Sequence, residues 1–141
     1  MRIKLIAAAA ILLMGSVDLG LGQVTSPTLE VVKETQTSVT LLLTAGSDAI
    51  DGFDIYYWIP GHGFFLTNFY GTAEDSSCER YTLEPGESLA VTIGAPARQR
   101  CRHDFTPRPL YCGRTYYFMA FPHNGSIQSN VTDGRTLECG F

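Results

Sequence analysis

The chain has 141 residues, 17% of them charged, and a formal net charge of −4. This balance excludes a broad nucleic-acid-binding surface, which requires a basic face. The length suits one domain with a modest core, and the acidic residues are too scattered to form a polyacidic cation-binding tract.

Residues 1–22 have the layout of a secretory signal peptide. Arg2 and Lys4 precede an apolar run from Leu5 to Met14, and a small-x-small site follows at Gly20-Leu21-Gly22. A membrane span needs about twenty apolar residues, so we expect none. The mature chain would be secreted to the extracellular space as residues 23–141, with eight basic and thirteen acidic residues and a net charge of −5.

Apolar and polar residues alternate through the mature sequence and helical periodicity is absent, which predicts an all-β protein. We expect seven short strands separated by turns or loops, at residues 28–33, 37–44, 50–59, 64–70, 88–93, 114–121 and 129–137. Residues 71–87 and 94–109 are expected to be loops. This pattern is typical of a seven-stranded antiparallel β-sandwich.

Strand parity separates the expected core from the expected surface, because successive strand residues point to opposite faces. The inward set is Val39, Leu41, Leu43, Phe53, Ile55, Tyr57, Leu89, Val91, Ile93, Tyr116, Phe118 and Ala120.

The segment Leu110–Ser126 has a turn glycine, Gly113, followed by Tyr116 at the start of an alternating strand. This is the arrangement of a tyrosine corner, in which the ring packs in the core and the hydroxyl reaches back to the backbone at the bend. The segment therefore favours a β-sandwich.

Three segments resemble a fibronectin type III domain, over about residues 27–137. Thr37–Leu41 resembles the second strand of that family, Ile50–Tyr57 the third, and Leu110–Phe118 with Asn124-Gly125 the tyrosine corner and last loop. The resemblance implies one fibronectin type III-like domain over residues 23–141, of the wider immunoglobulin-like class, that acts by binding protein. An immunoglobulin domain proper is disfavoured, because residues 37–44 contain no cysteine.

The chain departs from the family at two positions and in one loop. Leu43 stands where a core tryptophan is usual, and Cys112 replaces the usual proline of the corner. The connection Gly94–Pro109 is longer than is usual. A rival corner at Leu83-x-Pro85-Gly86 would place Leu89 where the tyrosine belongs.

The four cysteines are Cys78, Cys101, Cys112 and Cys139, and an even number in an exported chain predicts two disulfides. A zinc site is disfavoured, because no two cysteines are closer than eleven residues. If the last two strands fold about Asn124-Gly125, the residue opposite Cys112 lies near position 137, within reach of Cys139. Cys78 and Cys101 then pair by elimination.

Five large side chains are expected on one outer face, because the third strand and the tyrosine-corner strand are neighbours in this fold. They are Tyr56, Trp58, Tyr117, Met119 and Phe121. Such patches mark protein interfaces. Two alternatives are that residues 63–70 fold against the face and that the chain dimerises through it, and the oligomeric state stays open.

An arginine-rich loop is the second candidate site, with Arg98, Arg100, Arg102, His103 and Arg108. Guanidinium groups bind sulfate, phosphate and carboxylate, which would suit an anionic polysaccharide. A solvated loop is the alternative. We therefore expect a secreted, disulfide-stabilised protein-binding module acting in the extracellular matrix, at the cell surface or as a secreted effector. The alternative function is carbohydrate or glycosaminoglycan binding.

The sequence gives little evidence of a catalytic site. His62, His103 and His123 fall in expected turns or loops, and no serine or cysteine lies in a nucleophile motif. We expect no enzymatic activity, no cofactor and no metal. Asn124 and Asn130 begin N-glycosylation sequons.

Overall fold

The computed structural model describes residues 24–61, 66–70, 81–94, 109–124 and 127–140, and for 66–70 it describes only the backbone. The regular structure of these residues is entirely β, and none of their segments is a helix that could cross a membrane. The strands are β1 (Thr28–Glu34), β2 (Ser38–Thr44), β3 (Ile50–Asp51), β4 (Phe53–Trp58), β5 (Leu66–Tyr70), β6 (Thr82–Leu83), β7 (Ser88–Gly94), β8 (Thr115–Pro122) and β9 (Thr132–Arg135).

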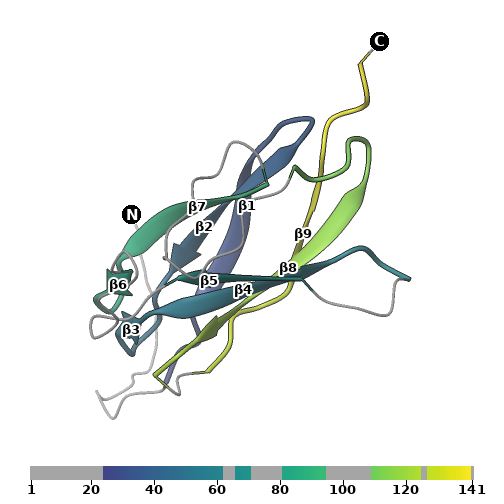
Figure 1. Ribbon diagram of the computed structural model, residues 1–141. Helices are drawn as coiled ribbons and strands as arrows, with labels where there is room; N and C mark the ends of the chain where they lie inside the picture. The colour runs from purple at the N-terminus through teal and green to yellow at the C-terminus, as the bar shows by residue number, and fades with distance from the viewer. Residues whose placement is uncertain (1–23, 62–65, 71–80, 95–108, 125–126, 141) are drawn as a thin grey trace, which may run out of the picture.

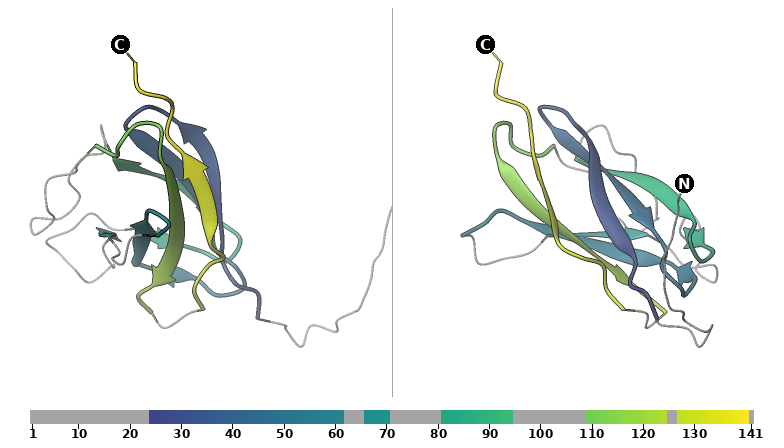
Figure 2. Two further views of the ribbon diagram at one scale, coloured as in Figure 1. Left: turned by 90° about the vertical axis from the view of Figure 1, so that its right-hand side faces the viewer. Right: turned by 180° about the vertical axis from the view of Figure 1, so that it is seen from behind.

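The strands form two main antiparallel sheets, as the alternating sequence predicts. One has the order β1-β2-β7 and the other β5-β4-β8-β9, while β3 and β6 make a short separate ladder. Figures 1 and 2 show the two sheets as layers, with β1 beside β9 at one edge. The architecture is consistent with a β-sandwich.

The residues expected inward form the core between the sheets. Val39, Leu41, Leu43, Phe53, Ile55, Ile93, Phe118 and Ala120 are all completely buried. Tyr57 stacks on Phe118 at 6.2 Å between ring centroids, and Tyr116 lies 6.4 Å from the same ring. Burying a large apolar side chain stabilises the fold by roughly 1.5–3 kcal/mol, so strand parity accounts for most of the core. Only Leu89 is partly exposed, and it packs against the core from β7.

The described residues contain nine strands where the sequence predicted seven. The expected strand at 50–59 is divided at Gly52, whose φ of 77° is accessible to glycine at little cost. The Gly52 N–H donates to Tyr81 O (2.8 Å), and its carbonyl accepts from the His123 N–H (2.9 Å). The chain therefore leaves the β3–β6 ladder and joins β8 within one residue, and β6 forms inside a segment that was expected to be loop.

The last strand begins later than predicted, at Thr132, because a bulge interrupts the pairing with β8 before that residue. Asn130 and Val131 together stand opposite Met119, between the flanking pairs Ser129–Ala120 and Thr132–Phe118. An extra residue on one strand is what defines a β-bulge. The bulge shifts the pairing of β9 by one residue from the register expected for a simple turn at Asn124-Gly125.

The bulge also brings Asn130 to the first sheet. Its side-chain amide accepts a hydrogen bond from the Leu29 N–H (2.8 Å) and donates to the Leu29 carbonyl (3.0 Å). Further along the same edge, the Arg135 N–H donates to the Glu34 carboxylate at 2.8 Å. Side chains thus satisfy backbone groups where β1 and β9 meet.

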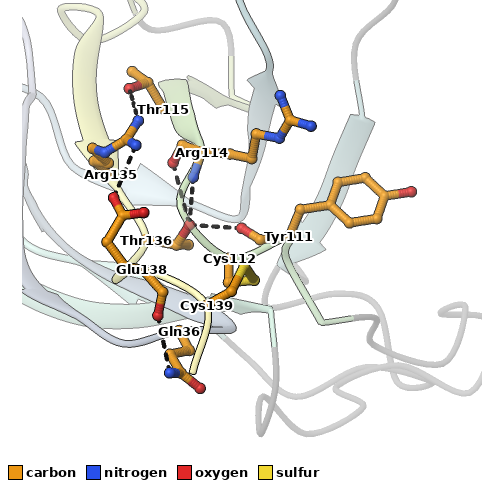
Figure 3. A network of polar contacts seen from close by, with 9 residues as sticks. All are labelled: Gln36, Tyr111, Cys112, Arg114, Thr115, Arg135, Thr136, Glu138 and Cys139. Carbon is orange, nitrogen blue, oxygen red and sulfur yellow. Dashed lines mark hydrogen bonds and ion pairs between the residues drawn. A yellow bond between two sulfur atoms is a disulfide. The ribbon is translucent and has the colours of Figure 1, made fainter. Parts of the chain in front are cut away.

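The tyrosine corner is present. Tyr116 is 2% exposed, and its hydroxyl accepts a hydrogen bond from the Tyr111 N–H at 2.9 Å. The Tyr111 carbonyl accepts from the hydroxyl of Thr136 at 2.6 Å, and that hydroxyl accepts in turn from the Arg114 N–H at 3.0 Å. Figure 3 shows Thr136 between these two backbone groups, with the Tyr111 ring directed away from them. Two buried side chains therefore fix the backbone of Tyr111.

A disulfide joins Cys112 to Cys139 next to this corner, as predicted, with a Cα–Cα distance of 5.1 Å (Figure 3). Gly113 makes the bend between Cys112 and β8 with a φ of 62°, and its N–H donates to the Leu137 carbonyl at 2.8 Å. The covalent bond and the backbone bond hold the C-terminal segment against the corner. The predicted partners Cys78 and Cys101 lie outside the described residues.

We predict that Tyr116→Phe lowers the free energy of unfolding by about 1–3 kcal/mol, because the Tyr111 N–H loses its acceptor. Urea unfolding followed by circular dichroism measures the change. Tyr117→Phe is the matched control on the same strand, since no hydrogen bond of the Tyr117 hydroxyl occurs among the described residues, and it should stay within about 0.5 kcal/mol. Equal effects of the two substitutions would contradict the role of the corner.

Stability should fall at alkaline pH because of the same residue. Burial raises the pKa of Tyr116 above its ordinary value of 10.0, although the bond from Tyr111 opposes the shift. The unfolded chain loses this proton first, so the stabilisation is complete below pH 10 and is lost as pH rises through the folded pKa. Urea unfolding between pH 9 and 11 should therefore show a steeper loss for the unaltered protein than for Tyr116→Phe. Parallel curves would refute the prediction.

Replacing Cys112 and Cys139 together by alanine should cost roughly 3–4 kcal/mol, since the bridge closes a loop with a sequence separation of 27. Chemical denaturation without reductant measures the loss. An unchanged midpoint would show that the hydrogen bonds of Thr136 and Gly113 hold the corner without the bridge.

Candidate protein interface

The five large side chains predicted to share an outer face do so. β4 and β8 are adjacent and antiparallel, with Tyr56 opposite Met119 and Trp58 opposite Tyr117. Phe121 follows on the same face of β8, and all five side chains are half-buried. We call these five residues the outer aromatic face.

The rings of this face pack in two cross-strand pairs. Tyr56 lies against Phe121 with 4.6 Å between centroids and an interplanar angle of 47°, and Trp58 meets Tyr117 edge to face at 5.7 Å and 86°. Such tilted contacts are the favoured geometry for aromatic pairs. Neither pair presents two coplanar rings, so neither pair forms one flat platform.

The backbone of β5 extends the sheet beyond β4 and does not lie over the outer aromatic face. It pairs with β4 from Phe53 opposite Tyr70 to Tyr57 opposite Leu66. The backbone of residues 66–70 is thus the hairpin partner that the sequence also suggested, while residues 63–65 and the side chains of 66–70 lie outside the described part of the chain.

Polar side chains surround the outer aromatic face on two sides. Asp54 and His123 are 3.0 Å apart (Oδ1 to Nε2) and about one-fifth to one-quarter exposed, at the end next to Phe121. On β9, Asp133 is opposite Tyr117 and is exposed. An aromatic centre with a charged rim is the usual anatomy of a protein interface.

The two rim carboxylates were not predicted as site residues. Parity alone could have assigned Asp54 to the outer face, because it is two residues from Tyr56 on β4. His123 was expected in a turn or loop, and the structure places it in the turn after β8, paired with Asp54. The sequence did not indicate that Asp133 lies beside the outer aromatic face, because its position opposite Tyr117 depends on the bulge before β9.

The other predicted sites can be placed only in part. The arginine loop of Arg98, Arg100, Arg102 and Arg108 lies outside the described residues, as do His62 and His103. Within the described ranges, no three His, Cys, Asp or Glu side chains group together to hold a metal ion.

Both sequon asparagines use their side-chain amides within the fold. Asn124 Nδ2 donates to the Ala49 carbonyl at 2.8 Å and Asn124 is exposed, at the turn that follows β8. Asn130 is held against Leu29 through both atoms of its amide. Glycosylation of either residue stays a prediction.

No protein-family model matches the chain, and no curated protein matches it significantly.

Proposed function

We propose that the protein is a secreted, disulfide-stabilised binding module with a fibronectin type III-like fold, and that the outer aromatic face is its interface with a protein partner. The observation that carries this proposal is the face itself, where five large apolar side chains are gathered on adjacent strands and only half-buried. Large apolar side chains gathered on the outer face of a sheet commonly mark a binding role.

Three features support the fold and location parts of the proposal. The strand orders β1-β2-β7 and β5-β4-β8-β9 suit a sandwich of three and four strands. The bond from Tyr111 to Tyr116 is typical of a tyrosine corner. The Cys112–Cys139 bridge is compatible with an oxidising, extracellular environment.

The ring geometry favours a protein partner over a sugar at this face. A pyranose ring stacks best on a flat aromatic surface, whereas the ring of Trp58 stands at 86° to that of Tyr117. A tilted aromatic surface with Met119 between its ring pairs suits apolar side chains, which fill gaps of irregular shape. Polysaccharide binding is therefore the weaker candidate at the outer aromatic face.

Affinity capture from the organism's own extracellular material tests the proposal. We expect a retained protein to be lost with Trp58→Ala and with Tyr117→Ala, because aromatic anchors dominate interface energies. Val32→Ala is the control, since Val32 is 50% exposed on β1 of the other sheet. If a partner is retained equally by the unaltered protein and by both aromatic variants, the interface lies elsewhere on the protein. Loss of heparin retention in those two variants would favour a polysaccharide instead.

A further inference from the structure

We propose that the outer aromatic face takes a basic segment of its partner protein, and that the row Trp58–Tyr117–Asp133 holds a lysine or arginine side chain. This inference rests on the proposed function and specifies the charge of the partner. It follows from the positions of three side chains on three adjacent strands.

The row is a consequence of the sheet register. Trp58 on β4 stands directly opposite Tyr117 on β8, and Tyr117 stands directly opposite Asp133 on β9. Directly opposed residues of an antiparallel pair have Cβ atoms about 4.5–5.5 Å apart. An aromatic pair and a carboxylate therefore lie side by side on one face, within reach of one long cationic side chain.

Asp133 is available to a partner. It is exposed, and no hydrogen bond or ion pair of its carboxylate occurs among the described residues. The nearest cation on its own strand, Arg135, is directed elsewhere, with Nη2 3.0 Å from Glu138 and Nη1 3.4 Å from the Thr115 hydroxyl (Figure 3). The Asp133 charge is thus not neutralised by its neighbour on β9.

Arginine and lysine suit this row by two independent interactions. A cation is attracted to the face of a tryptophan or tyrosine ring, and the adjacent carboxylate can form an ion pair with it, bidentate in the case of arginine. The aliphatic stem of either side chain can meanwhile cover apolar surface, which Met119 provides in the next row.

The wider charge distribution favours the same partner. The second rim carboxylate, Asp54, is opposite Phe121, and Arg135 and Glu138 neutralise each other. The described charges around the face are therefore acidic when His123 is neutral, and so is the whole chain, with a net charge of −4. Complementary potential directs a basic surface to such a face and repels an acidic one.

Two-dimensional NMR titration of the full chain with a defined probe tests the inference. The probe is the peptide acetyl-Gly-Arg-Gly-Arg-Gly-amide, compared with the same peptide carrying glutamine in place of arginine. We expect saturable shifts at Trp58, Tyr117 and Asp133 with the arginine peptide only. Asp133→Asn should weaken binding about fivefold, and the interaction should weaken as salt is raised.

Two further variants keep the test specific. Glu30→Gln removes an equal charge from an exposed position on β1 and should leave the affinity unchanged. Tyr117→Leu keeps an apolar side chain, removes the ring and should weaken binding. A circular dichroism spectrum and a denaturation midpoint equal to those of the unaltered protein show that a variant is folded.

The outcomes separate this inference from the proposed function. Equal binding of the two peptides, or equal effects of Asp133→Asn and Glu30→Gln on the affinity, overturns the proposal that the partner segment is basic. If natural partner capture nevertheless depends on Trp58 and Tyr117, the interface stands and only its charge preference is wrong. If capture does not depend on them either, both proposals fail.

Discussion

The structure depends on how the backbone of Tyr111 is fixed. Its N–H donates to the Tyr116 hydroxyl and its carbonyl accepts from Thr136, so both polar groups of one residue are held by buried side chains. Tyr116 belongs to β8 and Thr136 follows β9, and the bonds therefore set the two strands against each other at their open end. The disulfide from Cys112 adds a covalent tie at the same place. The hydrogen bonds and the disulfide together hold the C-terminal segment against the start of β8.

Most of the fold could be predicted, because it depends on sequence patterns within single strands and turns. Strand parity in β2 and β4 assigned the core, and the spacing from Gly113 to Tyr116 indicated the corner. The differences arise where one residue interrupts a pattern. Gly52 turns the chain from one ladder to another with a positive φ, and alternation on either side of a glycine carries no sign of that turn. β6 exists only because β3 is there to pair with it, which a local reading of the sequence cannot detect.

The candidate site was predictable in its centre and not at its rim. Parity within β4 and β8 assigned each of the five aromatic and methionine side chains to the outer side of its strand, and the resemblance to the fibronectin type III family indicated that the two strands are neighbours. The rim depends on register between strands. Counting from a turn at Asn124-Gly125 places Thr132 opposite Tyr117, whereas the bulge moves Asp133 into that position. A one-residue shift exchanges the two faces of a strand, so a single inserted residue decides whether a carboxylate borders the aromatic pair.

The bulge has a second consequence, at Asn130. The side-chain amide of this residue pairs with both backbone groups of Leu29, with Oδ1 accepting from the N–H and Nδ2 donating to the carbonyl. In an asparagine-linked glycan the first sugar carbon replaces one hydrogen of Nδ2. The nitrogen that would carry a sugar at this sequon is therefore the same atom that donates to the Leu29 carbonyl and so ties the segment before β9 to β1.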